Sequence, residues 1–317
     1  MNRGFKLRLL EWRDDGQVIW ITVIMLLVFA FFRADNFATS RNLTNVLGQY
    51  TSLMLITAGM LVVVVTGHID LSVASQVRLT AVLMSGVSDG NSLKFFAALV
   101  LVTCITFFVG WLNAWLINSF DIDAFIATLG MSIVLEGVTY AYTEKGEGSI
   151  PESISDFVYG SFGPLPFVFI IGVGLLVVLA KFLARTQTGL WMYAVGGEAM
   201  MAHRVGVNVH RTVTKSFIIC SIFTMVAAVI QVSRQGIGAP STGSGVELLA
   251  ITAVVMGGAA LGGGRGKVSA VVGGAMLLTL LNNVLNLTGI SQYWQTFVRG
   301  LIVVLGVGIF SKRLLKR

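Results

Sequence analysis

Charged residues are scarce in this chain. Lys, Arg, Asp and Glu make up only 12% of its 317 residues, whereas soluble domains carry about 25%. Proline occurs four times, and the two cysteines, Cys104 and Cys220, lie inside apolar runs where we expect them to be buried. This cysteine usage excludes a disulfide framework. Apolar residues make up 55%, and the mean hydropathy is +0.84. A soluble fold is therefore excluded, and the composition predicts a protein that crosses a membrane several times.

Motifs for catalysis and metal binding are also missing. The sequence contains no GxSxG, HExxH or paired-carboxylate pattern, so we predict no catalytic residue and no enzymatic activity. Residues 262–267 (GGGRGK) fail as a phosphate loop, because Leu261 and Val268 replace the required glycine and hydroxyl residue. His203 and His210 have a glycine between them and no Cys or acid cluster beside them, which argues against a metal site. We therefore expect the chain itself to bind no cofactor.

Apolar segments long enough to cross or nearly cross a bilayer of about 30 Å occur at ten places. The 36 glycines suit membrane helices that pack closely through small residues. The sequence therefore predicts an all-α polytopic membrane protein with about ten transmembrane helices, some of them short enough to be broken or re-entrant. The segments cover residues 18–32, 47–65, 73–87, 95–117, 125–143, 167–183, 217–231, 248–261, 268–285 and 294–309.

The distribution of Lys and Arg predicts the orientation. If the N-terminus is inside, fourteen of the 22 basic residues fall in inner segments, five in outer segments and three within spans. Positive charge concentrates on the cytoplasmic side of membrane proteins, so both termini are expected to be cytoplasmic. The net charge of +7 is thereby explained by topology, and no nucleic-acid partner is predicted.

The longest polar and basic interruption between apolar segments covers residues 185–215, after the sixth span. The whole chain, 1–317, is expected to form one transmembrane domain, with this loop on its cytoplasmic side. The loop admits two interpretations: an ordinary surface helix between spans, or a docking element for a soluble partner.

A short helix is predicted inside this loop. Gly196 and Gly197 are expected to form a flexible turn, and Glu198 places a carboxylate at a helix N-terminus, where it is favourable. Helix formers follow over residues 199–204, and Gly206 stands where a glycine stop is common.

Two alanines define the face that a partner would contact. Ala199 and Ala202 are three residues apart and are expected to share one small exposed face of that helix.

Two similar stretches suggest that the chain consists of two related halves. Residues 67–72 follow the second span and residues 245–250 the seventh, and each stretch has a glycine, an acid (Asp70 or Glu247) and a leucine before a small-residue helix. In the ten-span scheme the two breaks lie on opposite sides of the membrane. Spans two to five and seven to ten are therefore predicted to be inverted repeats, as in many transporters.

Polar residues inside spans are costly and usually face a cavity or a partner. Asp70, Arg78, Glu136 and Arg299 lie within or at the ends of spans. Asp70 is expected either to cap the following helix or to pair through a bridging water with Arg78, which lies two turns further along. Candidate pathway residues also include Glu247 and a set of amides, which could hydrogen-bond a polyhydroxylated solute or only neighbouring helices. These amides are Asn113, Asn118, Asn282, Asn283 and Asn286.

Several stretches together resemble one family, the permease subunits of bacterial ABC importers for ribose-type sugars. They occur in family order from the second span to the last. The matching stretches are TGHIDLSVAS, FIATLGM, RTQTGLWMYAVGGEAMMAHRVGVNV, GSGVELLAITAVVMGG, GGGRGKVS and LLNNVLNLTGISQYWQTFVRGLIVV.

The resemblance implies a pathway-forming subunit in the bacterial inner membrane. Its partners would be a second permease subunit, ABC ATPase subunits that bind ATP and Mg²⁺, and a periplasmic sugar-binding protein. It also implies that residues 196–206 are the coupling helix that contacts the ATPase. Departures from the family pattern include His68, Ala74, Glu136 and the acid at Glu198 in place of position 199.

Two other classes of function stay open from the residues alone. An ion-coupled secondary transporter would use Asp70, Glu136 and Glu247 as coupling sites, but it does not need a helical cytoplasmic loop. A channel would pass solute without ATP or an ion gradient. The sequence does not name the sugar.

Overall fold

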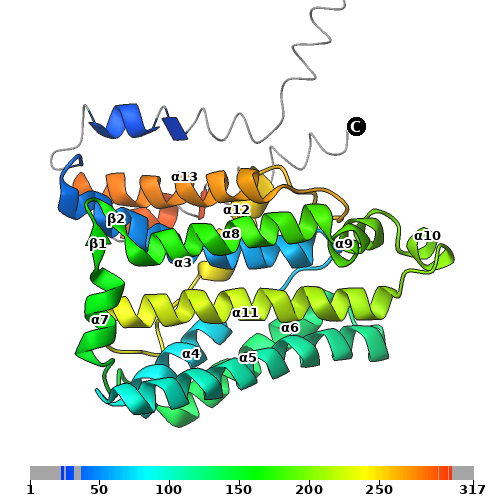
Figure 1. The fold of residues 1–317 in the computed structure, drawn as a ribbon, viewed down its shortest axis with the longest axis horizontal. Coiled ribbons are helices and arrows are strands. Elements are labelled where there is room, and N and C mark those ends of the chain that lie inside the picture. Colours follow the sequence, from blue (N-terminus) through cyan, green and yellow to red (C-terminus); the bar gives the residue numbers. More distant parts are fainter. Residues whose placement is uncertain (1–22, 25, 32–36, 292, 299, 302–317) are drawn as a thin grey trace, which may run out of the picture.

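The computed structural model describes residues 23, 24, 26–31, 37–291, 293–298, 300 and 301. Almost all ordered elements are helices, and a two-stranded antiparallel hairpin is the one sheet in this part of the chain (Figure 1). The elements are α3 (Ser40–Val64), α4 (Val73–Ser88), α5 (Ser92–Phe120), α6 (Ala124–Tyr142), α7 (Glu152–Tyr159), β1 (Ser161–Phe162), β2 (Leu165–Pro166), α8 (Phe167–Arg185), α9 (Gln187–Gly197), α10 (Ala199–Arg204), α11 (Val209–Gln235), α12 (Val246–Met256) and α13 (Val268–Leu287).

Six of these helices are long and apolar enough to cross a membrane: α3, α5, α6, α8, α11 and α13. This confirms the predicted all-α polytopic class. The predicted third and eighth spans are present as α4 and α12, with 16 and 11 residues. At about 1.5 Å per residue, both are shorter than a bilayer core of about 30 Å. The predicted first and tenth spans are described only in part, and Arg299 lies outside the described residues.

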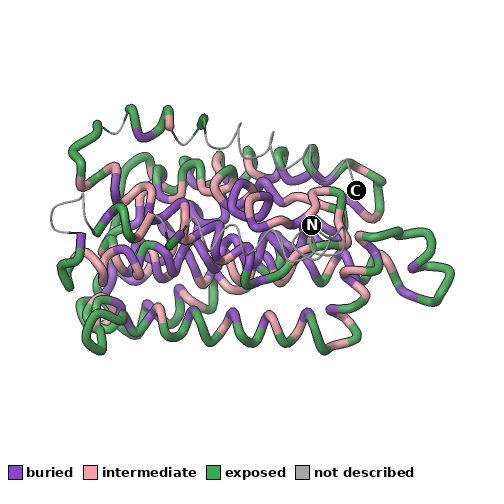
Figure 2. Tube along the Cα trace, turned by 90° about the horizontal axis from the view of Figure 1, so that it is seen from above, coloured by how far each residue is buried: buried purple, intermediate pink, exposed green. Residues whose placement is uncertain are grey.

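Helix α3 lies at the centre of the bundle. Every residue from 51 to 66 is buried, and α8, α11, α12 and α13 pack around it. Figure 2 shows the buried residues gathered in this interior. A helix that is apolar on all sides is most stable when it is surrounded. Gly59 allows close approach of α11, since a Cβ there would lie 3.0 Å from the Phe223 side chain and 3.1 Å from the Cys220 carbonyl.

The packing partners in the two halves correspond. Helix α3 contacts α12 and α13, and its counterpart α11 contacts α4 and α5. Helix α4 packs on α5, and α12 packs on α13 in the same way. Helices α3 and α11 begin at opposite ends of the molecule (Figure 1). Gly67 and Gly245, the glycines that open the two similar stretches, both have a positive φ, of 87° and 78°. This is the arrangement that an inverted repeat requires.

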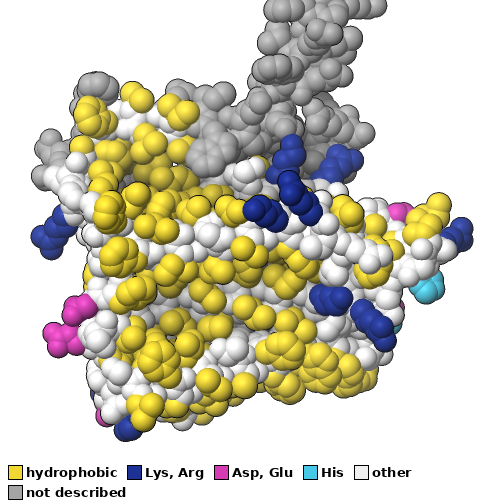
Figure 3. All heavy atoms as spheres, viewed as in Figure 1, with side chains coloured by type: hydrophobic (Ala, Val, Ile, Leu, Met, Phe, Trp, Pro, Cys, Tyr) yellow, Lys and Arg dark blue, Asp and Glu magenta, His cyan; other side chains and the backbone are white. Residues whose placement is uncertain are grey.

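On the face drawn in Figure 3, apolar side chains cover much of the surface between the two ends of the bundle, where charged side chains gather. Ile133 on α6 and Val178 on α8 are examples, with exposed fractions of 65% and 64%. Cys220 is buried as expected, but the same expectation is wrong for Cys104, which is exposed on α5. A cysteine in an apolar run can face lipid as readily as protein.

Candidate functional site

An open cavity of about 780 Å³ lies at the end of the bundle that carries α7. Its walls come from α3, the end of α7, α11, α12, α13 and the loop that joins α11 to α12. Most of its polar lining consists of amides and hydroxyls. The polar lining residues are Gln49, Ser52, Tyr159, Gln231, Arg234, Gln235, Ser241, Thr242, Ser244, Thr279 and Asn282.

Arg234 is the charged residue in this lining, and the fold holds it in place. Its guanidinium donates to the backbone and side-chain oxygens of Asn45, both at 3.4 Å. It also lies 5.7 Å from the centre of the Tyr159 ring, a favourable cation–π arrangement. The absence of a side chain at Gly48 leaves space for the Arg234 guanidinium, because a Cβ there would overlap it.

The chemistry of the cavity suits a neutral solute that carries many hydroxyl groups. Amide side chains both donate and accept hydrogen bonds, and hydroxyls do the same. The volume also falls in the usual range for small-molecule pockets, about 300–1,000 Å³.

Of the amides that the sequence suggested, Asn282 is the one that lines this cavity. Sequence reasoning missed the polar pairs on α3 and α11. Gln231 and Gln235 are four residues apart, and Gln49 and Ser52 are three apart, so each pair shares one helix face. Polar residues at helical spacing inside apolar runs were the signal that would have revealed them.

Three other predicted amides join protein segments. Asn118 donates to the His210 carbonyl at 3.1 Å and so connects α5 to α11. Asn283 exchanges two hydrogen bonds with Asn42, at 2.8 and 3.2 Å, and connects α13 to α3. The side-chain oxygen of Asn286 accepts from Gln295 at 3.1 Å. For these residues the structure supports the helix-packing alternative.

Asp70 fits neither predicted role closely. The N-cap of α4 is Ser72, two residues after Asp70. The Asp70 carboxylate accepts the Ser72 backbone N–H at 2.9 Å and the Ser72 hydroxyl at 2.5 Å, so it stabilises the turn before α4. Asn113 joins the same group by donating to the Ser72 hydroxyl at 2.9 Å.

Asp70 and Arg78 form no direct ion pair in the part of the chain that the structure describes. The Arg78 guanidinium instead pairs with the Glu136 carboxylate of α6 at 2.7 Å. Arg78 is buried, whereas 43% of the Glu136 side chain is exposed. Glu247, in the first turn of α12, lies near enough to interact electrostatically with both residues.

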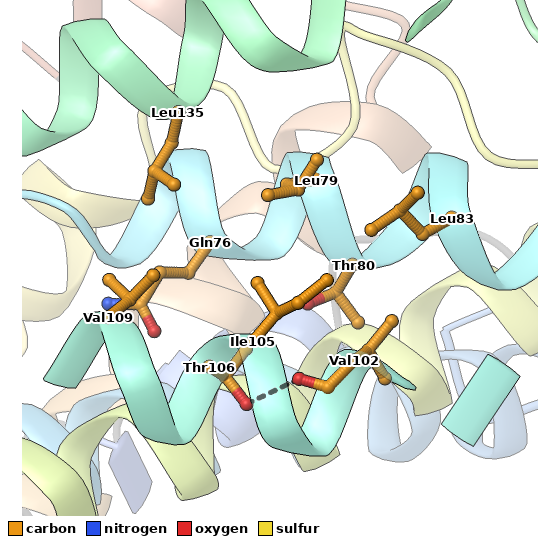
Figure 4. Close-up of a pocket in the computed structure, with 9 residues that line it drawn as sticks. All are labelled: Gln76, Leu79, Thr80, Leu83, Val102, Ile105, Thr106, Val109 and Leu135. Carbon is orange, nitrogen blue, oxygen red and sulfur yellow. Dashed lines mark hydrogen bonds between the residues drawn. The ribbon is translucent and has the colours of Figure 1, made fainter. Parts of the chain in front are cut away.

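A second, narrower gap lies between α4, α5 and α6 (Figure 4). It has no room for a water molecule. Its walls are mainly aliphatic, and the Gln76 side chain extends into it from α4. This gap is too small for a solute and belongs to the helix packing.

At the opposite end, the loop after α8 folds into α9 and α10. The predicted turn at Gly196 and Gly197 is wrong, because both residues end α9 and the chain turns at Glu198, whose backbone is extended (φ −161°, ψ 96°). The predicted stop at Gly206 is confirmed. It has φ 89°, and the N–H groups of Gly206 and Val207 donate to the carbonyls of His203 and Ala202, each at 3.0 Å, which is a Schellman motif.

The exposed face of α10 differs from the predicted one. Ala202 is buried in the same apolar cluster as Val207, as the Schellman motif favours. Only Ala199 of the predicted pair is exposed. The large exposed apolar side chains are Met200, Met201 and Val205, with exposed fractions of 64%, 57% and 80%.

Three glycine-containing segments meet where α9 reaches the transmembrane helices. The Gly264 N–H donates to the Val65 carbonyl at 2.9 Å, and the Tyr193 hydroxyl donates to the Gly266 carbonyl at 2.8 Å. A Cβ on Gly196 would overlap the Val65 carbonyl oxygen and lie 2.6 Å from the Gly264 nitrogen. We call this contact of 65–67, 196 and 262–266 the glycine junction. The segment 262–267 is thus a tight turn in the fold.

Known proteins resemble this chain over nearly all of its length. The ribose import permease protein RbsC of Escherichia coli (strain K12) is 32% identical over 300 residues, 92% of each chain. The L-arabinose transport system permease protein AraH of the same organism is 34% identical over 314 residues, 95% of this chain and 91% of the relative. The D-allose transport system permease protein AlsC, also from that organism, is 27% identical over 299 residues, 93% of this chain and 91% of the relative.

No solved structure matches the chain. A family model does match, over residues 42–307, and it describes the permease component of the branched-chain amino acid transport system. The six apolar spanning helices and the polar cavity accord with such a component. The chain therefore belongs to this family of transport-system permease components.

Proposed function

We propose that the chain forms the translocation pathway of an ATP-driven importer for a monosaccharide. The observation that carries this proposal is the cavity lined by amides and hydroxyls, of a size and polarity that suit a neutral sugar. Relatives named as permeases for ribose, arabinose and allose favour the same class of solute.

The proposed assembly has four kinds of component. The chain pairs with a second permease subunit in the bacterial inner membrane and receives sugar from a periplasmic binding protein. Separate ATPase subunits bind ATP and Mg²⁺ and contact the chain at α10, as the exposed Met200, Met201 and Val205 favour. Both termini and the α9–α10 end are cytoplasmic in this proposal, which the bias of basic residues supports.

The glycine junction supplies a physical route for coupling. Helix α9 is adjacent to the docking helix α10, and its last turn contacts the break after α3 and the turn before α13 through backbone atoms. Movement of α10 by the ATPase would therefore move two membrane segments that pack around the cavity. Hydrogen-bond networks and rigid secondary elements of this kind are among the physical networks that carry coupling between distant sites.

The cavity is tested by Gln231→Leu. The leucine removes hydrogen-bonding groups from the wall, so we expect sugar uptake by proteoliposomes to fall about tenfold, the equivalent of about one hydrogen bond in free energy. Thr103→Val, a polar-to-apolar change on α5 outside the cavity, serves as the control and should transport normally. Equal uptake by Gln231→Leu and wild type would show that the cavity is not part of the translocation pathway.

The same vesicles separate the three classes of function. An ATP-driven importer requires ATP on the cytoplasmic side and is unaffected by a proton uncoupler. Uptake that an uncoupler abolishes would establish an ion-coupled transporter, and uptake that needs neither ATP nor a gradient would establish a channel.

The docking surface is tested by Met201→Glu. Because the side chain is exposed, the charge should leave the fold intact but disfavour burial against a partner. We expect normal insertion, with co-purification of the ATPase reduced at least tenfold. Phe162→Glu, at the opposite end of the molecule and 80% exposed, should retain the ATPase. Retention of the ATPase by both variants would support the alternative of an ordinary surface helix.

A further inference from the structure

Four buried polar side chains meet at the start of α4. Asp70, Ser72 and Asn113 have no exposed surface and Gln76 only 1%. Ser72 lies at the centre of this group, because its hydroxyl is within 2.5 Å of the Asp70 carboxylate and 2.9 Å of each amide nitrogen. The cluster joins the chain break after α3 to α4 and α5.

This cluster has too few donor protons for its acceptor oxygens, so some of the oxygens have no hydrogen-bond partner. The Ser72 hydroxyl has one proton, which it donates to Oδ1 of Asp70. Both amides must then turn an N–H group toward the Ser72 oxygen, so their own oxygens face elsewhere. Three acceptors are left buried without a hydrogen bond: Oδ2 of Asp70, Oε1 of Gln76 and Oδ1 of Asn113.

Rotating the amides does not resolve this excess of acceptors. An amide oxygen turned toward Ser72 would compete with Asp70 for the single hydroxyl proton. Each of the three unpaired oxygens belongs to a side chain whose other polar atom contacts the Ser72 hydroxyl, so the three side chains surround one residue.

The carboxylate also lacks a basic partner. Arg78, the basic residue nearest to it in the sequence, pairs with Glu136 instead. Of the four cluster residues, Gln76 lines the gap between α4, α5 and α6, and that gap is too narrow for water (Figure 4). A fully buried carboxylate with no compensating charge is costly.

We propose that this cluster binds a monovalent cation of the sodium class. Hard cations prefer carboxylate and amide oxygens, and these are the atoms that the cluster leaves free. One carboxylate balances one positive charge, whereas a divalent ion would leave a net charge buried. A dehydrated sodium ion also occupies less space than a water molecule.

A bound cation would connect the break after α3 to α4 through Asp70 and Gln76, and to α5 through Asn113. The site is therefore structural and does not depend on the proposed function. Its occupancy would stabilise the native state in proportion to the cation concentration.

The experiment measures thermal unfolding of the full-length permease in detergent. NaCl replaces choline chloride at constant ionic strength and pH. We expect a saturable rise in Tm on the order of 2–4 °C for wild type. The rise should be lost in Asp70→Asn and in Asn113→Leu. It should persist in Glu247→Gln, a change at an acid outside the cluster.

Direct binding of radioactive sodium to wild type keeps the proposal testable if the variants fail to fold, and one ion per chain is expected. Equal Tm values in sodium and choline, with no bound sodium, would mean that the oxygens hold protons or water and would overturn the proposal. A sodium effect that survives in both cluster variants would also overturn it, by placing the ion elsewhere.

Discussion

Replacing Gly196 with alanine is expected to reduce uptake by more than tenfold, while the same change at Gly197 leaves uptake normal. A Cβ at Gly196 would overlap the Val65 carbonyl oxygen and approach the Gly264 nitrogen to 2.6 Å. At Gly197 an added Cβ has no neighbour within 4 Å. The two variants therefore add the same atom to adjacent residues of one helix and differ only in what it meets.

The cost at Gly196 is expected to be high because the obstructing atoms belong to the backbone. Overpacking a core usually costs about 1–3 kcal/mol when side chains can adjust. Here α9 must separate from the glycine junction, and the hydrogen bond from Gly264 to Val65 is at risk. We expect a reduction of uptake by more than tenfold and a lower Tm, with the protein still inserted in the membrane.

Uptake and Tm of the two purified variants provide the measurement. Because alanine is the better helix former, Gly197→Ala is expected to retain at least the wild-type Tm. If Gly196→Ala transports normally, the contact at the junction is not essential, and coupling between α10 and the membrane helices must follow another route.

Removing Glu136 is expected to destabilise the membrane bundle through Arg78. Glu136→Leu leaves the buried guanidinium without its carboxylate partner at 2.7 Å. Breaking a buried pair costs about 3–5 kcal/mol. Because 43% of the Glu136 side chain is exposed, and because Glu247 lies nearby, we expect about 1–3 kcal/mol here.

A double variant separates two causes of the expected destabilisation: the loss of the ion pair itself and the burial of an unpaired Arg78 guanidinium. Arg78→Leu combined with Glu136→Leu removes both charges, so most of the stability lost in Glu136→Leu should return. Chemical or thermal unfolding of wild type, both single variants and the double variant measures this coupling. Additive losses in the double variant would show that the two side chains act independently.

The sequence by itself determined the class of protein and most of its helices. Apolar runs predicted α5, α6, α8 and α13 closely, because burial in lipid depends on length and hydrophobicity, which are local properties. Local chemistry likewise predicted the helix of residues 199–204 and its stop at Gly206, since only a few residues accept a left-handed backbone.

Tertiary structure decided which residues meet. Asp70, just before the helix that carries Arg78, was its nearest acid in the sequence, but the packing of α6 brings Glu136 to Arg78. Gly196 and Gly197 are indistinguishable in sequence, and only the approach of the Val65 carbonyl separates them. The cavity required α3, α11, α12 and α13 to be placed together. Hydrophobic patterning specifies which segments are buried, whereas contacts between distant segments depend on how all the helices fill the space around α3.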